Sequence, residues 1–530
     1  MPGRAAGTVL LVPGSIHTPL TVDALLRVVA ERDAEVALLK LMVDKLKAQL
    51  ARRAREQYGA SSERLDAQLT LIDAEAPSAQ PSSAEPVSAA PPPKTQPRRR
   101  DQRRLPEHLP RETRLHHPEG YTPDAPCGCS QCGGKLRQIG QDVADQLEYV
   151  PGHFKVLRHV RPKLACVRCE AIFQAPAPSR PIERGLPGPA LLAHVMVAKY
   201  CDHLPLYRQS RIHAREGVDI DRSTMAGWVG QGDALLDPLA AALGRYTLAG
   251  AKVHADDTPV PVLDPGRGRT KTGRLWVYVR DDRPCAAKDP PAVWFQYSPD
   301  RGGEHPRRHL QHYRGILQAD AYSGYDKLYD SGRVVHAACM AHARRYYWDV
   351  YEAQKRAPGS VAEQALKRIA RLYEIEADIR GRPPQERRRE RLGRAAPLLQ
   401  ELHEWLSQTL QRVSAKSELG QAIGYTLGHW KALTRYCDDG RIEIDNNAAE
   451  RALRGVGLGR KNYLFFGSDA GGERAAVIYS LVETAKLNGL DPQRYLREVF
   501  ERIAEHPINR IEELLPWNIG RSLQAHREAA

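Results

Sequence analysis

The sequence lacks a long apolar run. In 530 residues no stretch of about 18 consecutive apolar side chains occurs, the length that a helix needs to span a bilayer, so we expect no membrane-spanning helix. The run TVLLVPGSIHTPL is short, is broken by Pro13 and Gly14 and lacks a small-residue cleavage site, so we expect no signal peptide. Cysteine is scarce and odd in number, with nine residues, and five of them fall within 127–169. This pattern favours a metal site in a reducing cytoplasm over disulfides.

Acidic residues are too few to balance the basic ones. The formal net charge is +14 and the pI is about 9.3. Such an excess favours a polyanionic partner such as nucleic acid, although a well-solvated basic surface has the same composition. The densest basic tract contains Arg98, Arg99 and Arg100, with Arg103 and Arg104 close behind. We expect this tract either to be solvated or to hold phosphates.

The N-terminal part has a helical pattern followed by a low-complexity segment. Within residues 21–66, one seam of a heptad repeat has Val29, Val36, Val43 and Leu50, and the other has Leu25, Leu39 and Leu46. This pattern predicts a parallel two-stranded coiled coil and hence a homodimer or higher oligomer; an amphipathic helix packed on its own domain is the alternative. Residues 73–112 are rich in Pro, Ala and Ser, then in Arg, and predict a disordered linker.

Four cysteines have the spacing of a structural zinc site. Cys129 and Cys132 form one CxxC pair, and Cys166 and Cys169 form another. Two such pairs supply four thiolates in a closed tetrahedral arrangement, so we predict that they bind Zn²⁺ within a domain over 115–180. Cys127 competes with Cys129 for one position, and the x-x spacing favours Cys129.

The remainder reads as helices, then strands, then helices. Residues 186–235 predict three short helices, the last from about Ser223 to Gly230, arranged as a helix-turn-helix or as an ordinary helical connector. Short β-rich runs follow, and the segment 350–440 then has two helical apolar patterns. The β-rich runs are VHADDTPV, RLWVYVRD, AVWFQYSP, GILQADAY and RVVHAAC.

Three acidic residues stand at the ends of strands or the start of a helix. Asp256 and Asp320 end two β-rich runs, and Glu450 lies in the helix that DNNAAERALR begins. Phosphodiester chemistry uses two divalent ions about 4 Å apart, and carboxylates suit Mg²⁺ or Mn²⁺. Each residue taken alone reads more simply as a surface acid or a helix cap, so the prediction depends on all three together.

Basic residues surround the predicted acidic helix. Asn447, Glu450 and Arg454 share one helical face, as a metal beside a phosphate would require; a surface helix with an ion pair is the alternative. We predict DNA contacts for this region. For the segment CMAHARR at 339–345 we predict a helix that contacts DNA or the core, and a metal site at Cys339 and His342 is the weaker interpretation. The predicted DNA-contacting residues here are Arg344, Arg345, Arg451, Arg454, Arg460 and Lys461.

These segments together make the chain resemble the large transposase of the insertion sequence 66 family, over residues 25–520. The most specific matches are DNNAAERALR at 445–454, KNYLFFGSDAGGERAA at 461–476 and LLPWNIG at 514–520. Further matches are YGASSERLD, the CxxC pairs, KYCDHLPLYRQ, HADDTPV, LQADAYSGY and CMAHARR.

The resemblance implies a multidomain α+β protein. Its expected parts are a leucine zipper, a zinc-binding domain, a helix-turn-helix and an RNase H-like α/β core with a helical insertion. The expected boundaries are 248–349 and 441–490 for the core, 350–440 for the insertion and 491–530 for a helical tail. The family's DDE triad falls on Asp256, Asp320 and Glu450. The family has Asp-Glu-Thr-Pro where this chain has Asp256-Asp257-Thr258-Pro259, so Asp257 is an acidic alternative to Asp256.

The implied function is metal-dependent cleavage at insertion-sequence ends followed by strand transfer into target DNA. The implied partners are DNA, a second copy of the chain and small accessory proteins of the same element, in the bacterial cytoplasm at the nucleoid. A catalytically inactive DNA-binding derivative and a nuclease of the same fold are the alternatives. The first would have lost one of the three acids, and all three are present.

Overall fold

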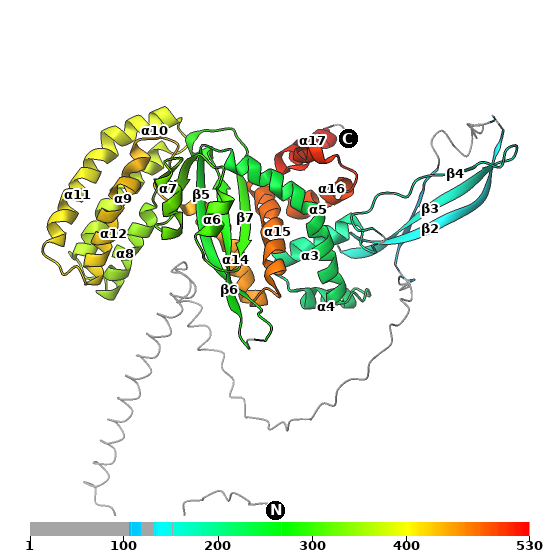
Figure 1. Cartoon of the computed structure of the whole chain (residues 1–530), viewed down its shortest axis with the longest axis horizontal. Helices are drawn as coiled ribbons and strands as arrows, with labels where there is room; N and C mark the ends of the chain where they lie inside the picture. The colour runs from blue at the N-terminus through cyan, green and yellow to red at the C-terminus, as the bar shows by residue number, and fades with distance from the viewer. Residues whose placement is uncertain are drawn as a thin grey trace, which may run out of the picture. The chain divides into compact units, whose positions relative to one another are not determined.

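The computed structural model describes residues 105–528, apart from 118–131 and the single positions 106, 108, 133, 151, 184 and 267. The predicted coiled coil at 21–66 and the tract Arg98–Arg100 lie outside the described residues. Among the described helices, none is long and apolar enough to cross a membrane. The described part contains two separate sheets and two groups of helices (Figure 1).

The first sheet is built on a long hairpin. β2 (Leu136–Val150) and β3 (His153–Cys166) pair antiparallel along their whole length. Against the outer edge of β3 lie β1 (Arg111–Leu115), which is parallel to it, and β4 (Ile172–Gln174), which is antiparallel. β1 begins inside 73–112, the segment that the sequence predicts as a disordered linker. The chain is fixed just before β1 because Leu109 is buried in the main core.

Three helices follow the hairpin: α3 (Pro189–Tyr200), α4 (Leu206–Arg215) and α5 (Arg222–Leu248). The predicted end of the third helix near Gly230 is wrong. α5 begins after Asp221, whose carboxylate accepts the N–H of Ser223, and runs to Leu248. The helix continues because Leu236, Leu239 and Leu243 repeat the buried apolar face beyond the glycine.

The second sheet has five strands, and they coincide with the five β-rich runs of the sequence. They are β5 (Lys252–Val262), β6 (Lys271–Arg280), β7 (Ala292–Ser298), β8 (Gly315–Gln318) and β9 (Val334–Ala337). The order across the sheet is β7-β6-β5-β8-β9. β5, β6 and β7 form an antiparallel meander, whereas β8 and β9 run parallel to β5.

Both faces of this sheet are buried. On one face Val260 and Val277 join the main core together with α3, α5, α14 (Asn447–Tyr463) and α15 (Asp469–Leu487). On the other face Trp276 and Tyr278 pack with Tyr325 in a smaller core near the short helices α6 (Glu304–His309) and α7 (Asp326–Asp330). Strands that are covered on both faces read as continuous apolar runs, which explains the segment LWVYV in β6.

Helix α15 also covers the exposed edge of the sheet. The hydroxyl of Ser480 accepts the backbone N–H of Phe295, and the hydroxyl of Thr484 accepts that of Val293. These backbone N–H groups on the outer edge of β7 therefore have partners within the chain. Unpaired, they would be free to pair with a strand of another chain.

The segment between β9 and α14 is helical and has a core of its own. Its helices are α8 (Met340–Ala353), α9 (Val361–Ile379), α10 (Pro384–Glu390), α11 (Ala396–Leu410), α12 (Glu418–Gly428) and α13 (Trp430–Thr434). Arg387 and Arg391, both nearly fully buried, donate to Glu376, and Arg387 also reaches Glu443 at 2.8 Å. Removing one member of such a buried set would leave an uncompensated charge.

The chain ends in α16 (Pro492–Arg502), a 3₁₀ segment η5 (Ile508–Leu514) and α17 (Pro516–Glu528). Leu496, Val499 and Leu514 of this part are buried in the main core.

Candidate functional site

Asp256 lies on β5, and Asp320 lies at the matching point just after the neighbouring parallel strand β8. His254 on β5 pairs in register with Gln318 on β8, and each acidic residue follows two positions later. Neighbouring strands lie about 4.8 Å apart, and residues two apart share a face, so this register brings the two acidic residues together at one end of β8.

Glu450 comes from the first turn of α14, and Asn446 fixes that helix to the sheet. Asn446 is fully buried, and its amide nitrogen donates to the Ala255 carbonyl at 2.8 Å. Its amide oxygen lies 3.0 Å from Nδ1 of His254. Since that oxygen can only accept, Nδ1 of His254 holds the proton. Asn446 therefore ties the start of α14 to the two residues just before Asp256.

The charges of the neighbouring acids act on Asp256. Burial raises the pKa of Asp256 well above its usual value, and the negative charges of Asp320, Asp257 and Glu450 raise it further. Burial also raises the pKa of Asp320, against the opposing effect of His342. A carboxyl whose pKa is raised by burial and by neighbouring carboxylates is typical of a site that several carboxylates share.

Asp257 leaves the strand on the opposite face. Its carboxylate accepts from Arg274 at 3.0 Å and from Arg301 at 2.9 Å, and its side chain is 2 % exposed. Arg301 also lies 3.9 Å from the carboxylate of Asp320. Asp257 is thus neutralised by two arginines, whereas Asp256 receives a hydrogen bond from the backbone N–H of Asp257.

The segment CMAHARR lies against Glu450. His342 Nε2 and Arg345 Nη2 each lie 3.8 Å from a Glu450 carboxylate oxygen. Cys339 is fully buried and its sulfur accepts the backbone N–H of Asn446. A ligand atom of Cys339, of His342 and of Glu450 all lie within 4.8 Å of one another. The cysteine is therefore a core contact, and the histidine adjoins the candidate site.

The predicted DNA-contacting residues differ in their surroundings. Arg344, Arg451, Arg454 and Lys461 are exposed. Arg345 faces Glu450, and the Arg460 guanidinium donates to the Pro259 carbonyl on β5. These two arginines therefore also have contacts within the protein.

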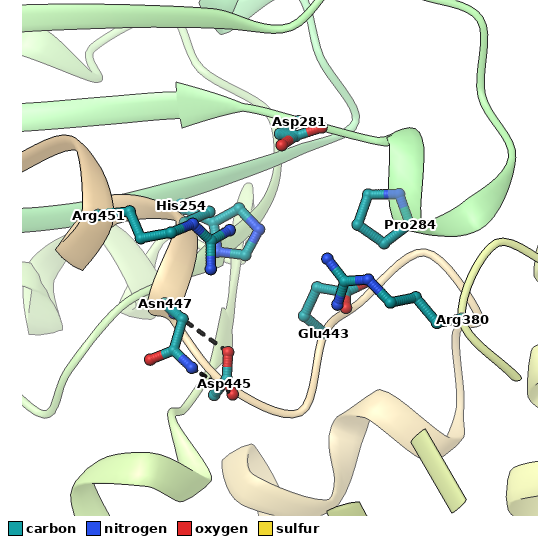
Figure 2. Close-up of a pocket in the computed structure, with 9 residues that line it drawn as sticks. His254, Asp281, Pro284, Arg380, Glu443, Asp445, Asn447 and Arg451 are labelled. Carbon is teal, nitrogen blue, oxygen red and sulfur yellow. Dashed lines mark hydrogen bonds between the residues drawn. The ribbon is translucent and has the colours of Figure 1, made fainter. Parts of the chain in front are cut away.

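A small polar cavity adjoins the site at the start of α14 (Figure 2). Its volume is about 70 Å³, and His254 and Arg451 lie on one side of it, opposite Glu443 and Arg380. The Nε2 atom of His254 is buried here and makes no hydrogen bond with any described residue. Burial lowers the pKa of His254 to about 3, so the ring is neutral. As described, the lining includes none of the three acids.

The residues at the acidic site fit a divalent cation. Glu450 Oε1 is buried and accepts no hydrogen bond from the described residues. Burial and the neighbouring carboxylates disfavour the charged form of Asp256, and a bound cation would stabilise that form. Carboxylate oxygens are the hard ligands that Mg²⁺ and Mn²⁺ prefer.

Three of the four predicted zinc ligands converge at the end of the β2–β3 hairpin. The sulfur atoms of Cys132, Cys166 and Cys169 lie within 4.8 Å of one another, and Cys129 lies outside the described residues. Burial disfavours the Cys166 thiolate, but the N–H groups of Cys169 and Arg168 outweigh it and lower the pKa to about 6. A Cβ on Gly134 would lie 3.0 Å from the Cys166 sulfur, so only glycine leaves this space open. These features fit Zn²⁺.

The sequence alone pointed to Asn447 but missed Asn446 and Arg301. The signal for Asn446 was that two asparagines are adjacent at the start of the helix. Only one of two adjacent residues can face the sheet there, so either could have been the buried one. Nothing in the sequence marks Arg301, because it reaches the site from a loop.

Comparison with known families gives matches along most of the chain. The model of "Transposase IS66 family" matches residues 184–474, and that of "IS66 C-terminal element" matches 480–517. The "zinc-finger binding domain of transposase IS66" matches 126–170, which contains both CxxC pairs, and "Transposase C of IS166 homeodomain" matches 45–114.

Similar proteins occur in Sinorhizobium fredii (strain NBRC 101917 / NGR234). The uncharacterized protein y4hP is 37% identical over 505 residues, which cover 92% of this chain and 90% of the relative. The uncharacterized protein y4jD is 37% identical over 516 residues, which cover 94% and 96% respectively.

Proposed function

The chain belongs to the IS66 transposase family, and we propose that it cleaves DNA at the ends of an insertion sequence and transfers the freed strand into target DNA. What supports this proposal is that the register of β5 and β8 brings Asp256 and Asp320 together and that the charges of Asp320 and Glu450 raise the pKa of Asp256.

The proposed fold of the catalytic part is an RNase H-like core. In support, the five-stranded sheet has an antiparallel meander of three strands extended by two parallel strands. The first acid lies on the central strand β5, the second follows β8, and the third lies on the helix that comes after the helical segment. The proposed core is 248–349 with 441–490, and the insertion is 350–440.

The proposed chemistry is a pair of in-line displacements at phosphorus. Water attacks a phosphodiester at the element's end, and the 3′-oxygen leaves as a hydroxyl. That hydroxyl then attacks a target phosphodiester and displaces a second 3′-oxygen. Asp256, Asp320 and Glu450 would hold Mg²⁺ or Mn²⁺, which, when bound, activates the attacking oxygen and stabilises the leaving one.

Other residues position this set. Asn446 fixes the start of α14, and His342 and Arg345 hold the Glu450 carboxylate from the side. Arg301 neutralises Asp257 and restrains Asp320. Arg451 and Arg454 are exposed next to Glu450 along α14 and would steady phosphates.

The remaining parts are proposed to hold DNA and to assemble the complex. The zinc-binding domain, with Zn²⁺ on Cys129, Cys132, Cys166 and Cys169, and the helices of 186–235 would bind the terminal repeats. The coiled coil at 21–66 would join two copies, and accessory proteins of the element would complete the assembly in the cytoplasm, at the nucleoid.

The test is an assay with a labelled duplex that contains the end of the element encoding this chain, with Mg²⁺ and a target plasmid. The unchanged protein should yield cut ends and joined products, and Asp256→Asn should lose both, by about 1,000-fold or more, while still binding the duplex. Asp237→Asn, an exposed carboxylate on α5, is the matched control and should leave both reactions intact. Asp257→Asn should reduce activity without abolishing it, because Asp257 acts through Arg301.

Cut ends without joined products would identify a nuclease. Binding without cutting in the unchanged protein would identify an inactive derivative, and either result would overturn the proposal.

A further inference from the structure

The outward face of α14 combines basic and apolar side chains. Arg451, Arg454, Leu458 and Lys461 are exposed at helical spacing, and Phe465 follows four positions later. The buried residues of the helix, including Ala452 and Val456, lie between them in sequence. One stripe of cations therefore runs from beside Glu450 to an apolar tip.

The tip is Leu464 and Phe465, held out by an unusual turn. Leu464 is 66% exposed and Phe465 is 42% exposed. Leu464 has φ 56° and ψ −45°, and the N–H of Phe465 donates to the carbonyl of Tyr463. This is the rarer, strained form of the γ-turn, which a β-carbon disfavours. A leucine adopts this conformation only where the surrounding structure enforces it.

Contacts on both sides of the turn hold it in place. The Arg460 guanidinium donates to the Pro259 carbonyl, just before the turn. Just after it, Phe466 donates its N–H to the Pro261 carbonyl and accepts that of Leu263. The end of β5 therefore fixes the chain on both sides, and the apolar pair is displayed from a rigid support.

The surroundings of the tip are basic. Arg208 of α4 lies 3.4 Å from the Asn462 side chain, two residues before Leu464. Arg208 and Arg211 are exposed on α4, and their guanidinium groups stack near the ring of Tyr207. An apolar partner surface would leave these cations without counter-charges. A nucleic acid offers phosphates for the cations and base faces for the apolar pair.

We propose that Leu464 and Phe465 form a wedge that enters the DNA end bound along α14 and unstacks a base there. The inference rests on the proposed function, because that function places the cleaved phosphate near Glu450. Fourteen residues of helix span about 21 Å. At about 3.4 Å per base step, the wedge meets the duplex about six base pairs from the cleaved phosphate. Apolar side chains inserted at a base step disrupt stacking locally, and basic neighbours hold the backbone while they do so.

The test uses the full-length Asp256→Asn protein, which binds without cutting, and duplexes of the element's end. Each duplex has 2-aminopurine at one position within about ten base pairs of the cut, since this base fluoresces more strongly when unstacked. We expect a several-fold rise at one or two neighbouring positions, about four to eight base pairs from the cut.

Two variants remove the wedge in different ways. Phe465→Ala removes the ring, and Leu464→Gly removes the side chain at a φ that glycine tolerates, so the turn persists. Both should return the fluorescence to that of the free duplex and weaken binding by less than about tenfold. Phe465→Trp should keep the signal. Ile508→Ala, which truncates a residue that is 68% exposed on η5, is the matched control and should also keep it.

Unchanged fluorescence in the two wedge variants would overturn the inference, as would a bound duplex with no unstacked position. Loss of self-association in sedimentation, with fluorescence retained, would instead assign the tip to a contact between copies. If the unchanged protein unstacks the base but does not cut the duplex, the wedge is supported and only the catalytic proposal is refuted. A failure to bind the end duplex would refute both.

Discussion

Replacing Asn446 with alanine tests how the site is assembled. The Asn446 side chain is fully buried and makes two hydrogen bonds, one to the Ala255 carbonyl at 2.8 Å and one with His254 at 3.0 Å. Alanine would remove the partner of both of these buried groups.

The magnitude follows from those two orphaned groups. Each buried donor or acceptor that loses its partner costs about 1–3 kcal/mol, so with two such groups the free energy of unfolding should fall by about 2–6 kcal/mol. The start of α14 would also be free to move from β5. A displacement of about 1 Å at Glu450 is enough to cost about 100-fold in cleavage rate.

Urea denaturation can be followed by intrinsic tryptophan fluorescence. Two of the seven tryptophans, Trp276 and Trp294, belong to the sheet that Asn446 contacts. The matched control is Asn447→Ala. The side-chain amide nitrogen of Asn447 donates to the Asp445 carboxylate at 2.8 Å, and this hydrogen bond is only partly buried. Its loss should lower the free energy of unfolding by less than about 1 kcal/mol. If the free energy of unfolding of Asn446→Ala lies within about 1 kcal/mol of that of the unchanged protein and the variant cleaves normally, the reasoning about this residue is refuted.

Further predictions concern other parts of the chain. Cys166→Ser should reduce bound zinc from about one per chain to none, by metal analysis of the purified protein; a folded, zinc-free unchanged protein would contradict the site. Leu39→Lys with Leu46→Lys should shift sedimentation from dimer to monomer, and an unchanged oligomer would mean that this helix packs within its own chain. Burial raises the pKa of Asp233 to about 6, above its unfolded value near 4, so the folded state gains stability from protonation below about pH 4 and loses it as pH rises through 6. Asp233→Asn should therefore raise the stability at pH 7 by about 1 kcal/mol after allowance for solvent screening, with no gain at pH 4; an equal effect at both pH values would exclude this cause.

Local patterns in the sequence were enough to find the strands and to single out the acids as candidates. Each β-rich run became a strand of the second sheet because continuous apolar segments can be buried on both faces. The helical rows Leu366, Ile369, Leu372 and Leu399, Leu402, Leu406 are buried as their spacing predicts. The end of α5 was missed because glycine in a helix costs only about 1 kcal/mol, and burial of the later leucines outweighs it.

By itself the sequence singled out the residues that we propose carry the chemistry: the acids, the cysteine pairs and the basic residues of α14. Only the tertiary structure decided how they are used. It matched Asp256 with Asp320 across β5 and β8, directed Asp257 to two arginines on the opposite face, and brought His342 and Arg345 to Glu450. It also showed that Leu464 and Phe465 are held outward rather than buried. Residue type and spacing fix local conformation, whereas strand register and helix docking, which join distant segments, fix which side chains meet.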